Sequence, residues 1–335
     1  MQRSTKDEIL SRLLSANGEP ISGQLLADQL MISRTAVWKQ IQRLQEEGFT
    51  IHTVKKYGYV LTATEINPLN GTTVLERLKT KRYGKNIHVF SEVTSTQFVA
   101  HELLEEALDG TVIVAESQTA GRGRMAREWD SAAKKGLWFT TILRPNCLPH
   151  EAPQFTLIAA VAIVNAIKSL YPTLSPQIKW PNDLLIGGRK LTGILTEMVA
   201  ETDRVKALLI GIGINVHHEQ EDFPEALQSI ATSLKLELEK LESGFVELDR
   251  ASLLAEILFY LEHYSDVYVK YGFGRIKPLW EEASCTIGQF VRATTLREVI
   301  EGKAVSITET GVLQIQQNNG HIVEVYSADI ELIKH

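Results

Sequence analysis

The segment 118–129, QTAGRGRMAREW, has the residue types best suited to chemistry on an anion. It contains two glycines, three arginines and few side chains that could pack a core. Glycine lets main-chain N–H groups approach a ligand closely, and arginine presents a planar fork that matches phosphate or carboxylate oxygens. We call 118–129 the clasp. Its composition predicts a mobile loop that orders over an anionic ligand.

The clasp also contains a possible dinucleotide fingerprint. Gly121, Gly123 and Ala126 form GxGxxA after the predicted strand TVIVAES. That fingerprint requires a helix to open at the glycines, but the following REWDSAAKKG has no apolar helical face. The Walker spacing GxxxxGK[ST] does not occur in the clasp either. The sequence therefore favours another anionic ligand over a dinucleotide.

A second polar cluster occupies 178–198, IKWPNDLLIGGRKLTGILTEM. Gly187 and Gly188 between two apolar runs predict a two-residue hairpin, so Lys190 begins the returning strand. Neither feature requires a function, because a lysine on a strand most often points into solvent and Trp-Pro-Asn-Asp is explained equally well as a tight turn. A cation beside a Gly/Arg loop is nevertheless what an enzyme that handles ATP phosphates requires.

A third polar cluster, TSTQ at 94–97, joins a predicted strand to a predicted helix. A single hydroxyl at this junction would be explained by capping of the helix N-terminus. Three hydroxyls and Gln97 are more than capping requires, so two interpretations remain: capping alone, or binding of a polar ligand. The predicted helix, 94–110, has its apolar positions at Phe98, Val99, Leu103, Leu104 and Leu108.

The predicted helices and strands that carry these clusters indicate a central domain over 83–283. A linker and a connecting helix at 63–82 precede it. Its predicted strands are 87–93, 111–117 and 136–145, followed by an apolar helix at 155–171. From 178 to 216, with a turn at 201–203, the chain predicts an antiparallel meander, unlike a Rossmann sheet. An amphipathic helix at 252–272 continues through 274–284. Residues 284–335 predict a small β-barrel with turns at 301–302, 309–311 and 318–320.

Residues 1–62 predict a winged helix-turn-helix with helices over 5–16, 22–30 and 33–48 and two strands around KKYG. Their inward apolar positions are Ile9, Leu10, Leu13 and Leu14, then Leu25, Leu26 and Leu30, then Val37, Ile41 and Leu44. DNA binding is the favoured function, and a purely protein-binding module is the alternative. The candidate DNA-binding residues are Ser22, Ser33, Arg34, Thr35, Lys39, Arg43, Lys55 and Lys56, with Arg34, Thr35 and Lys39 at base edges and the basic residues of the wing at phosphates.

Length and composition limit the number of domains, the cellular location and the role of the cysteines. The 335 residues exceed one ordinary core, and we find no apolar run near the roughly 20 residues of a membrane span, so we expect a cytoplasmic protein with no membrane partner. Cys147 and Cys285 stand far apart in the sequence, which predicts neither a disulfide framework nor a zinc site.

Charge is distributed unevenly along the chain. Residues 1–62 contain eight Lys and Arg and six Asp and Glu, whereas the remaining residues contain 27 Lys and Arg and 35 Asp and Glu. Blocks of different sign suggest different partners.

Five motifs together resemble the biotin protein ligase family: STQ at Ser95, QTAGRGR at Gln118, KWPNDL at Lys179, GRKLTGILTE at Gly188 and GIGIN at Gly211. With a winged helix in front, the chain resembles the bifunctional type, which is both a biotin-[acetyl-CoA-carboxylase] ligase and a biotin operon repressor. The resemblance implies an α+β multidomain protein: a winged helix-turn-helix, a central catalytic domain of class II synthetase type with a mixed or antiparallel sheet, and an SH3-like C-terminal domain.

The resemblance also implies a two-step reaction. Biotin and MgATP form biotinyl-5'-adenylate and pyrophosphate, and the adenylate then acylates one lysine of the biotin carboxyl carrier protein of acetyl-CoA carboxylase. The adenylate-bound homodimer would repress biotin synthesis and transport genes at an operator. The implied residues are Lys190, Arg122 and Arg124 for catalysis; Ser95, Thr96, Gln97, Gln118, Gly121, Arg122, Gly123, Arg124, Lys190 and Gly193 for biotin; Arg124, Arg127, Trp129, Asn182, Asp183, Lys190, Gly213 and Asn215 for the nucleotide; and Asp183 for Mg²⁺. Gly193 and Gly213 would leave space for the two substrates.

Some positions depart from the family's best-known bacterial members. Met125 and Ala126 stand where those members have a second Arg and a Gly, and Gln97 stands where they have Asn. His217 and His218 adjoin EQEDFPE, a loop that the family uses to cover adenine. Solvated loop histidines are the commoner case, so these two receive no role.

Overall fold

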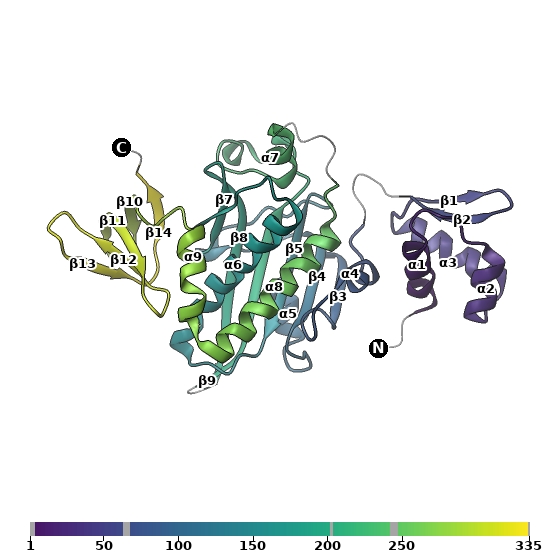
Figure 1. Ribbon diagram of the computed structural model, residues 1–335, viewed down its shortest axis with the longest axis horizontal. Helices are drawn as coiled ribbons and strands as arrows, with labels where there is room; N and C mark the ends of the chain where they lie inside the picture. Colours follow the sequence, from purple (N-terminus) through teal and green to yellow (C-terminus); the bar gives the residue numbers. More distant parts are fainter. Residues whose placement is uncertain (1–3, 63–67, 202–203, 242–246, 334–335) are drawn as a thin grey trace.

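The computed structural model describes residues 4–62, 68–201, 204–241 and 247–333. A small helical domain and a C-terminal sheet lie at opposite ends of a larger central domain (Figure 1). The predicted linker residues 63–67 and the predicted turn at 202–203 lie outside the described ranges.

The N-terminal domain contains α1 (Thr5–Ser15), α2 (Gly23–Leu30) and α3 (Arg34–Glu46), followed by the antiparallel hairpin β1 (Ile51–Val54) and β2 (Gly58–Leu61). The predicted helices are thus confirmed. Ser22 and Ser33 cap α2 and α3, because each side chain accepts a hydrogen bond from the backbone N–H three residues on. The prediction that Leu25 points inward is wrong: its side chain is 48% exposed, and the buried stripe of α2 is Leu26 and Ala27.

The central domain is built on one seven-stranded sheet in the order β3-β4-β5-β9-β8-β7-β6. β3 and β4 are parallel and every other pair is antiparallel, so the sheet is mixed, as expected. Gly187 and Gly188 form the predicted two-residue turn, both with positive φ. The strands are β3 (Ile87–Val93), β4 (Thr111–Gln118), β5 (Gly136–Leu143), β6 (Gln177–Lys179), β7 (Asp183–Ile186), β8 (Arg189–Glu201) and β9 (Arg204–Asn215).

Helices cover both faces of this sheet. α6 (Pro153–Leu170) and α8 (Arg250–Tyr271) pack together on one face (Figure 1). The short α5 (Thr96–Glu102) packs on the other through Ala100, and Leu104, just beyond its end, joins the same cluster. The remaining helices are α4 (Gly71–Arg77), α7 (Leu234–Lys240) and α9 (Lys277–Ala283).

Two predicted helices are shorter than expected. The helix predicted over 94–110 ends at Glu102, and Phe98 and Leu108 are 53% and 65% exposed rather than packed. The helix predicted to continue from 252 to 284 is interrupted at Gly272, whose φ of +74° suits glycine but not a side-chain-bearing residue.

One helical stretch, Pro149–Leu170, is long and apolar enough to cross a membrane, which corrects the expectation that no such run exists. Of the apolar window within it, 67% is buried inside the protein. Its packing against strands β6 to β9 and against α8 identifies it as the core helix of the central domain.

The C-terminal domain is a five-stranded antiparallel sheet in the order β13-β12-β11-β10-β14, whose described strands pair without closing into a barrel. The turn predicted at 301–302 is wrong, because Gly302 lies inside β11 and a Cβ there would come within 2.3 Å of the Gln316 carbonyl oxygen. The chain turns instead at Thr295 and Glu298. The strands are β10 (Phe290–Thr294), β11 (Val299–Ile307), β12 (Leu313–Gln316), β13 (Ile322–Val325) and β14 (Asp329–Leu332).

Candidate functional site

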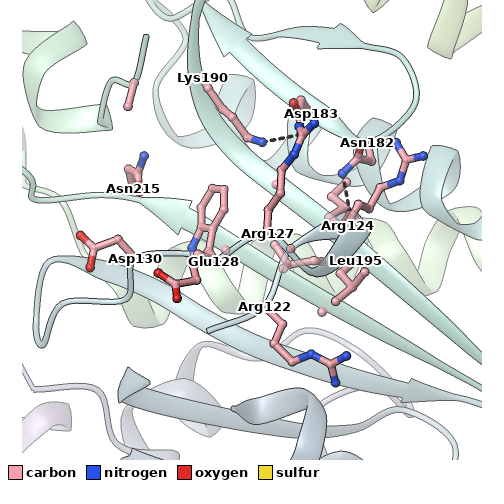
Figure 2. Close-up of a pocket in the computed structure, with 18 of the residues that line it drawn as sticks. Arg122, Arg124, Arg127, Glu128, Asp130, Asn182, Asp183, Lys190, Leu195 and Asn215 are labelled. Atoms are coloured by element: carbon pink, nitrogen blue, oxygen red, sulfur yellow. Dashed lines mark hydrogen bonds and ion pairs between the residues drawn. The ribbon is translucent and has the colours of Figure 1, made fainter. Parts of the chain in front are cut away.

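A cavity of about 460 Å³ lies where the clasp, the ends of the central strands, the loop after β9 and the start of β14 meet (Figure 2). No α-helix opens after β4, where the chain forms only a short 3₁₀ turn at Arg124–Ala126, so the prediction against a Rossmann site is confirmed. Among the predicted ligand-binding residues, the cavity lining includes Ser95, Thr96, Gln97, Gln118, Arg122, Gly123, Arg124, Arg127, Trp129, Asn182, Asp183, Lys190, Gly193, Gly213 and Asn215.

Gly121 is the predicted site residue that the lining does not include. A Cβ at this position would lie 2.3 Å from the Trp129 carbonyl oxygen and 2.6 Å from Ser131 Oγ. Glycine is therefore required so that the clasp backbone can fold back on itself, and Trp129 N–H donates to the Gly121 carbonyl oxygen at 2.9 Å.

A partly buried hydrogen-bond chain forms one wall of the cavity. Gln118 accepts from the backbone N–H of Thr96 at 2.8 Å and donates through Nε2 to Ser131 Oγ at 2.7 Å. Thr140 Oγ1 lies 2.9 Å from both Thr96 Oγ1 and Gln97 Oε1. These bonds hold the side-chain amides in fixed orientations. Sequence reasoning missed Thr140 and Ser131, since a threonine inside an apolar strand gives no separate signal.

Gln97 makes its hydrogen bonds within the protein. Its Nε2 donates to the carbonyl oxygens of Leu209 at 3.1 Å and Leu195 at 3.3 Å, while its Oε1 accepts from Thr140. The side chain is 3% exposed. Its glutamine amide thus ties α5 to strands β8 and β9 beneath the cavity.

Two of the clasp arginines are held by groups from the turn between β6 and β7 and from the C-terminal domain. Arg124 donates to Asn182 Oδ1 at 3.0 Å and to Ser327 Oγ at 2.8 Å. Arg127 forms an ion pair with Asp329 at the start of β14. Burial lowers the pKa of Arg124, and the nearby carboxylates oppose that effect. Sequence reasoning singled out no residue of the C-terminal domain, whose contribution follows only from tertiary structure.

Lys190 and Trp129 both line the cavity and lie close to each other. The Nζ of Lys190 lies 2.8 Å from Asp183 Oδ1 and 5.3 Å from the centre of the Trp129 ring (Figure 2). A Cβ on Gly193 or Gly213 would approach that ring to 2.8 Å and 2.4 Å. The two glycines were expected to make room for substrates, and in this structure they make room for the indole.

Comparisons with known proteins agree with this geometry. Family models match residues 74–215 as Biotin/lipoate A/B protein ligase family, 5–60 as a helix-turn-helix domain and 286–333 as Biotin protein ligase C terminal domain. The Bifunctional ligase/repressor BirA of Bacillus subtilis is 43% identical over 99% of this chain and 100% of its own. The chain belongs to the biotin protein ligase family.

Two further relatives of this ligase support the assignment. The Bifunctional ligase/repressor BirA of Escherichia coli is 29% identical over 91% of both chains. The solved structure of the biotin protein ligase from Aquifex aeolicus, in complex with biotin and ATP, is 28% identical, covers 75% of this chain and 100% of its own, and superposes with a TM-score of 0.64.

In this ligase, His217 and His218 are buried at 4% and 1% exposure, so the expectation of solvated loop histidines is wrong. Burial is the largest cause that lowers the pKa of each to about 4. His218 stacks on Phe223 at 4.8 Å with an interplanar angle of 12° and meets Trp138 edge-on at 5.9 Å. Of the two histidines, His218 lines the cavity.

The residues that the structure describes contain no group of three or more His, Cys, Asp and Glu side chains placed to hold a metal ion. Asp183 lines the cavity, and so do Glu128, Asp130 and Asp329, without forming such a group. Mg²⁺ is commonly bound by one or two carboxylates together with substrate phosphates, so the donor set fits an ion that arrives with ATP rather than a resident one.

Proposed function

We propose that this cavity joins biotin to ATP as biotinyl-5'-adenylate, with release of pyrophosphate, and then transfers biotin to a lysine of the biotin carboxyl carrier protein of acetyl-CoA carboxylase. The observation that carries the proposal is the convergence of Lys190, Arg124 and the half-buried Gln118 amide on one cavity. Relatives named as ligases and the Aquifex aeolicus structure with biotin and ATP support the choice of substrates.

In the first step, a carboxylate oxygen of biotin forms a bond to the α-phosphorus while the bond from that phosphorus to the bridging oxygen of pyrophosphate breaks. Both reactants are anions, so the site must supply positive charge where they meet. Lys190 provides it by exchanging the Asp183 carboxylate for phosphate and carboxylate oxygens. Mg²⁺ bound with ATP would supply further charge neutralisation, and Asp183 is the residue that would help to hold it.

In the second step, the amine of the carrier lysine attacks the carbonyl carbon of the adenylate and AMP leaves. Lys190 and Arg122 steady the carbonyl oxygen as it gains negative charge. The proposed biotin contacts are Ser95, Thr96, Gln97, Gln118, Arg122, Gly123, Arg124, Lys190 and Gly193, with Gly121 contributing through the fold of the clasp backbone. The proposed nucleotide contacts are Arg124, Arg127, Trp129, Asn182, Asp183, Lys190, Gly213 and Asn215.

The N-terminal domain is proposed to bind operator DNA as a winged helix-turn-helix. Arg34, Thr35 and Lys39 are exposed on α3, and Lys55 and Lys56 are exposed at the β1–β2 hairpin. Residues on α3 would read base edges, while the hairpin residues would contact phosphates as the wing. Arg43 would add a phosphate contact, and the capped N-termini at Ser22 and Ser33 would place backbone N–H groups near the DNA backbone.

The two activities are proposed to communicate. Adenylate would order the clasp, the ordered clasp would favour a cytoplasmic homodimer through the central sheet, and the dimer would present two wings to the operator. The domain limits proposed for this arrangement are 1–62, 63–82, 83–283 and 284–335, with the last as an SH3-like domain. Equal operator affinity with and without biotin plus ATP would contradict the coupling.

Biotin-dependent exchange of labelled pyrophosphate into ATP tests the enzymatic proposal directly. The expected result is exchange that requires both biotin and Mg²⁺. A protein that only senses a small molecule would give no exchange, and that outcome would overturn the ligase assignment.

A further inference from the structure

Thr140 on β5 is a fully buried hydroxyl in the wall of the cavity, and neither the sequence motifs nor the comparisons assign it a role. Its Oγ1 lies 2.9 Å from Thr96 Oγ1 and 2.9 Å from Gln97 Oε1. A threonine hydroxyl has one proton, so it donates to one of these two oxygens. The choice between them determines which hydrogen bonds the wall offers to a ligand.

The contacts of Gln97 decide where the Thr140 proton points. Gln97 Nε2 lies 3.1 Å from the carbonyl oxygen of Leu209 and 3.3 Å from that of Leu195. Both oxygens can only accept, so the amide orientation is fixed and Oε1 is the atom that faces Thr140. Gln97 is 3% exposed, and a buried acceptor without a donor is costly. Thr140 is the donor to Oε1 among the residues that the structure describes, so its proton is directed at Gln97.

The direction of this bond sets the state of the Thr96 hydroxyl. Because the Thr140 proton points at Gln97, Thr96 Oγ1 receives no proton from Thr140. The proton of Thr96 has two acceptors, Thr140 Oγ1 at 2.9 Å and Gln118 Oε1 at 3.2 Å. With either partner, Thr96 Oγ1 keeps a lone pair that no donor in the described part of the chain fills. Thr96 lines the cavity, so a ligand can supply that donor.

The amide of Gln118 is oriented by the same kind of argument. Ser131 Oγ donates to the Trp129 carbonyl oxygen at 3.1 Å and therefore accepts from Gln118 Nε2 at 2.7 Å. Gln118 Oε1 is thus an acceptor on the Thr96 side, where the Thr96 backbone N–H reaches it at 2.8 Å. The wall consequently presents hydrogen-bond acceptors from two neighbouring side chains. A planar ring with N–H donors, such as a cyclic urea, has the complementary chemistry.

We propose that Thr140 is a positioning residue: it directs the Thr96 hydroxyl so that the wall accepts hydrogen bonds, and so selects a cyclic urea over a ring in which oxygen replaces an N–H group. This inference rests on the proposed ligase function and deepens it. Thr140 acts through Thr96 and has no need to touch the ligand. A site built to pair a ligand donor discriminates strongly against analogues that lack the donor, because its own polar group is then left unpaired.

The test uses biotin-dependent pyrophosphate exchange with three ligands: biotin and the two isomeric cyclic carbamates, each with oxygen in place of one ureido N–H. We expect wild-type kcat/KM to favour biotin over at least one isomer by roughly 10-fold or more. Thr140→Val removes the hydroxyl at nearly the same volume and leaves the Thr96 hydroxyl free to turn. That preference should then fall at least about threefold and the KM for biotin should rise roughly 10-fold, while the KM for ATP stays within about twofold. Thr140→Ser keeps the hydroxyl and should keep the preference.

Thr141→Val is the matched control. Thr141 is also fully buried on β5, but it does not line the cavity and its hydroxyl has no hydrogen-bond partner among the described residues. Its biotin KM and its preference should equal those of the wild type. An unchanged preference in Thr140→Val would overturn the inference, and so would a preference lost in Thr140→Ser.

The wild-type protein decides the question even if Thr140→Val fails to fold. A wild type that uses biotin and both carbamates equally well would overturn the inference, because a wall of acceptors must discriminate against a ligand that lacks the donor. Absence of exchange with all three ligands would instead refute the ligase function itself.

Discussion

Lys190 and Asp183 face each other across the β7–β8 hairpin, with Nζ 2.8 Å from Oδ1. The Gly187–Gly188 turn sets the register that brings them together, since it pairs Ile186 with Arg189 and Leu185 with Lys190. The ion pair holds the lysine inside the cavity, so little reorganisation is needed when an anion takes the place of the carboxylate.

Replacing Lys190 tests its role in the first step. Lys190→Ala should reduce biotin-dependent pyrophosphate exchange by roughly 10²–10³-fold, the usual effect of removing a preorganised group that stabilises developing charge. Lys206→Ala is the control, because Lys206 also lies on a central strand but pairs with Glu105 at the surface. Near-normal exchange in Lys190→Ala would assign the charge stabilisation to another cation.

Arg124 joins the clasp to two other parts of the chain, through Asn182 and Ser327. Arg124→Gly should therefore release adenylate faster and weaken ligand-dependent dimerisation at the same time. Adenylate release is measured by stopped-flow chase and dimerisation by sedimentation with and without biotin plus ATP. If only one of the two changes, catalysis and assembly depend on different clasp residues.

The Arg127–Asp329 ion pair connects the clasp to the C-terminal domain. Both side chains are substantially exposed, at 65% and 42%, so Asp329→Asn should change the free energy of unfolding by about 1 kcal/mol or less. Its effect should appear instead as faster adenylate release. Glu331→Gln in the same strand, which breaks a surface contact with Arg292, is the matched control. Equal release rates in wild type and Asp329→Asn would show that the ion pair does not restrain the clasp.

Much of this arrangement could be predicted from the sequence, because local patterns encode it. The spacing of apolar residues and the capping residues predicted α1 to α3. The paired glycines predicted that Lys190 lies at the start of a returning strand, which is β8. The motifs also indicated the residues that the structure gathers around one cavity. Each of these signals lies within about 20 consecutive residues.

What could not be predicted depends on contacts between distant segments. Asp329 meets Arg127 across 202 positions of sequence, and neither residue reveals that pairing locally. The indole of Trp129 fills the space above Gly193 and Gly213, which only the folded clasp shows. The burial of His218 follows from its packing against Phe223 and Trp138, whereas a polar neighbouring sequence suggested solvent exposure.

A buried ion pair supports the strand that leads into the clasp. Arg250 binds Glu116 in bidentate fashion at 2.6 and 3.0 Å, and Glu116 also accepts the backbone N–H of Leu69 at 2.7 Å. Arg250→Met should lower the free energy of unfolding by about 3–5 kcal/mol, because it leaves a largely buried carboxylate without its countercharge. Urea denaturation measures the change.

The double variant Arg250→Met/Glu116→Leu provides the control for that prediction. It removes both charges and should recover much of the lost stability, since apolar replacements of a whole buried pair are often neutral. A double variant as unstable as Arg250→Met would show that packing of the arginine, rather than the uncompensated charge, accounts for the loss.

The buried histidines predict a dependence of stability on pH. Burial lowers the pKa of His217 and His218 to about 4, whereas in the unfolded chain both have a pKa near 6.5. Between these values the unfolded state binds more protons, so the free energy of unfolding should rise with pH and be lost as pH falls from about 6.5 toward 4. The slope is at most about 1.4 kcal/mol per pH unit for each histidine.

Urea midpoints between pH 5.5 and 6.5 isolate this effect, because Asp222 and Glu262, whose carboxylate pKa values are lowered, titrate at more acid pH. His218→Phe should roughly halve the slope, since one of the two depressed groups is gone and the aromatic packing on Phe223 remains. A slope unchanged in His218→Phe would mean that the folded protein already accommodates a charged imidazolium at this position.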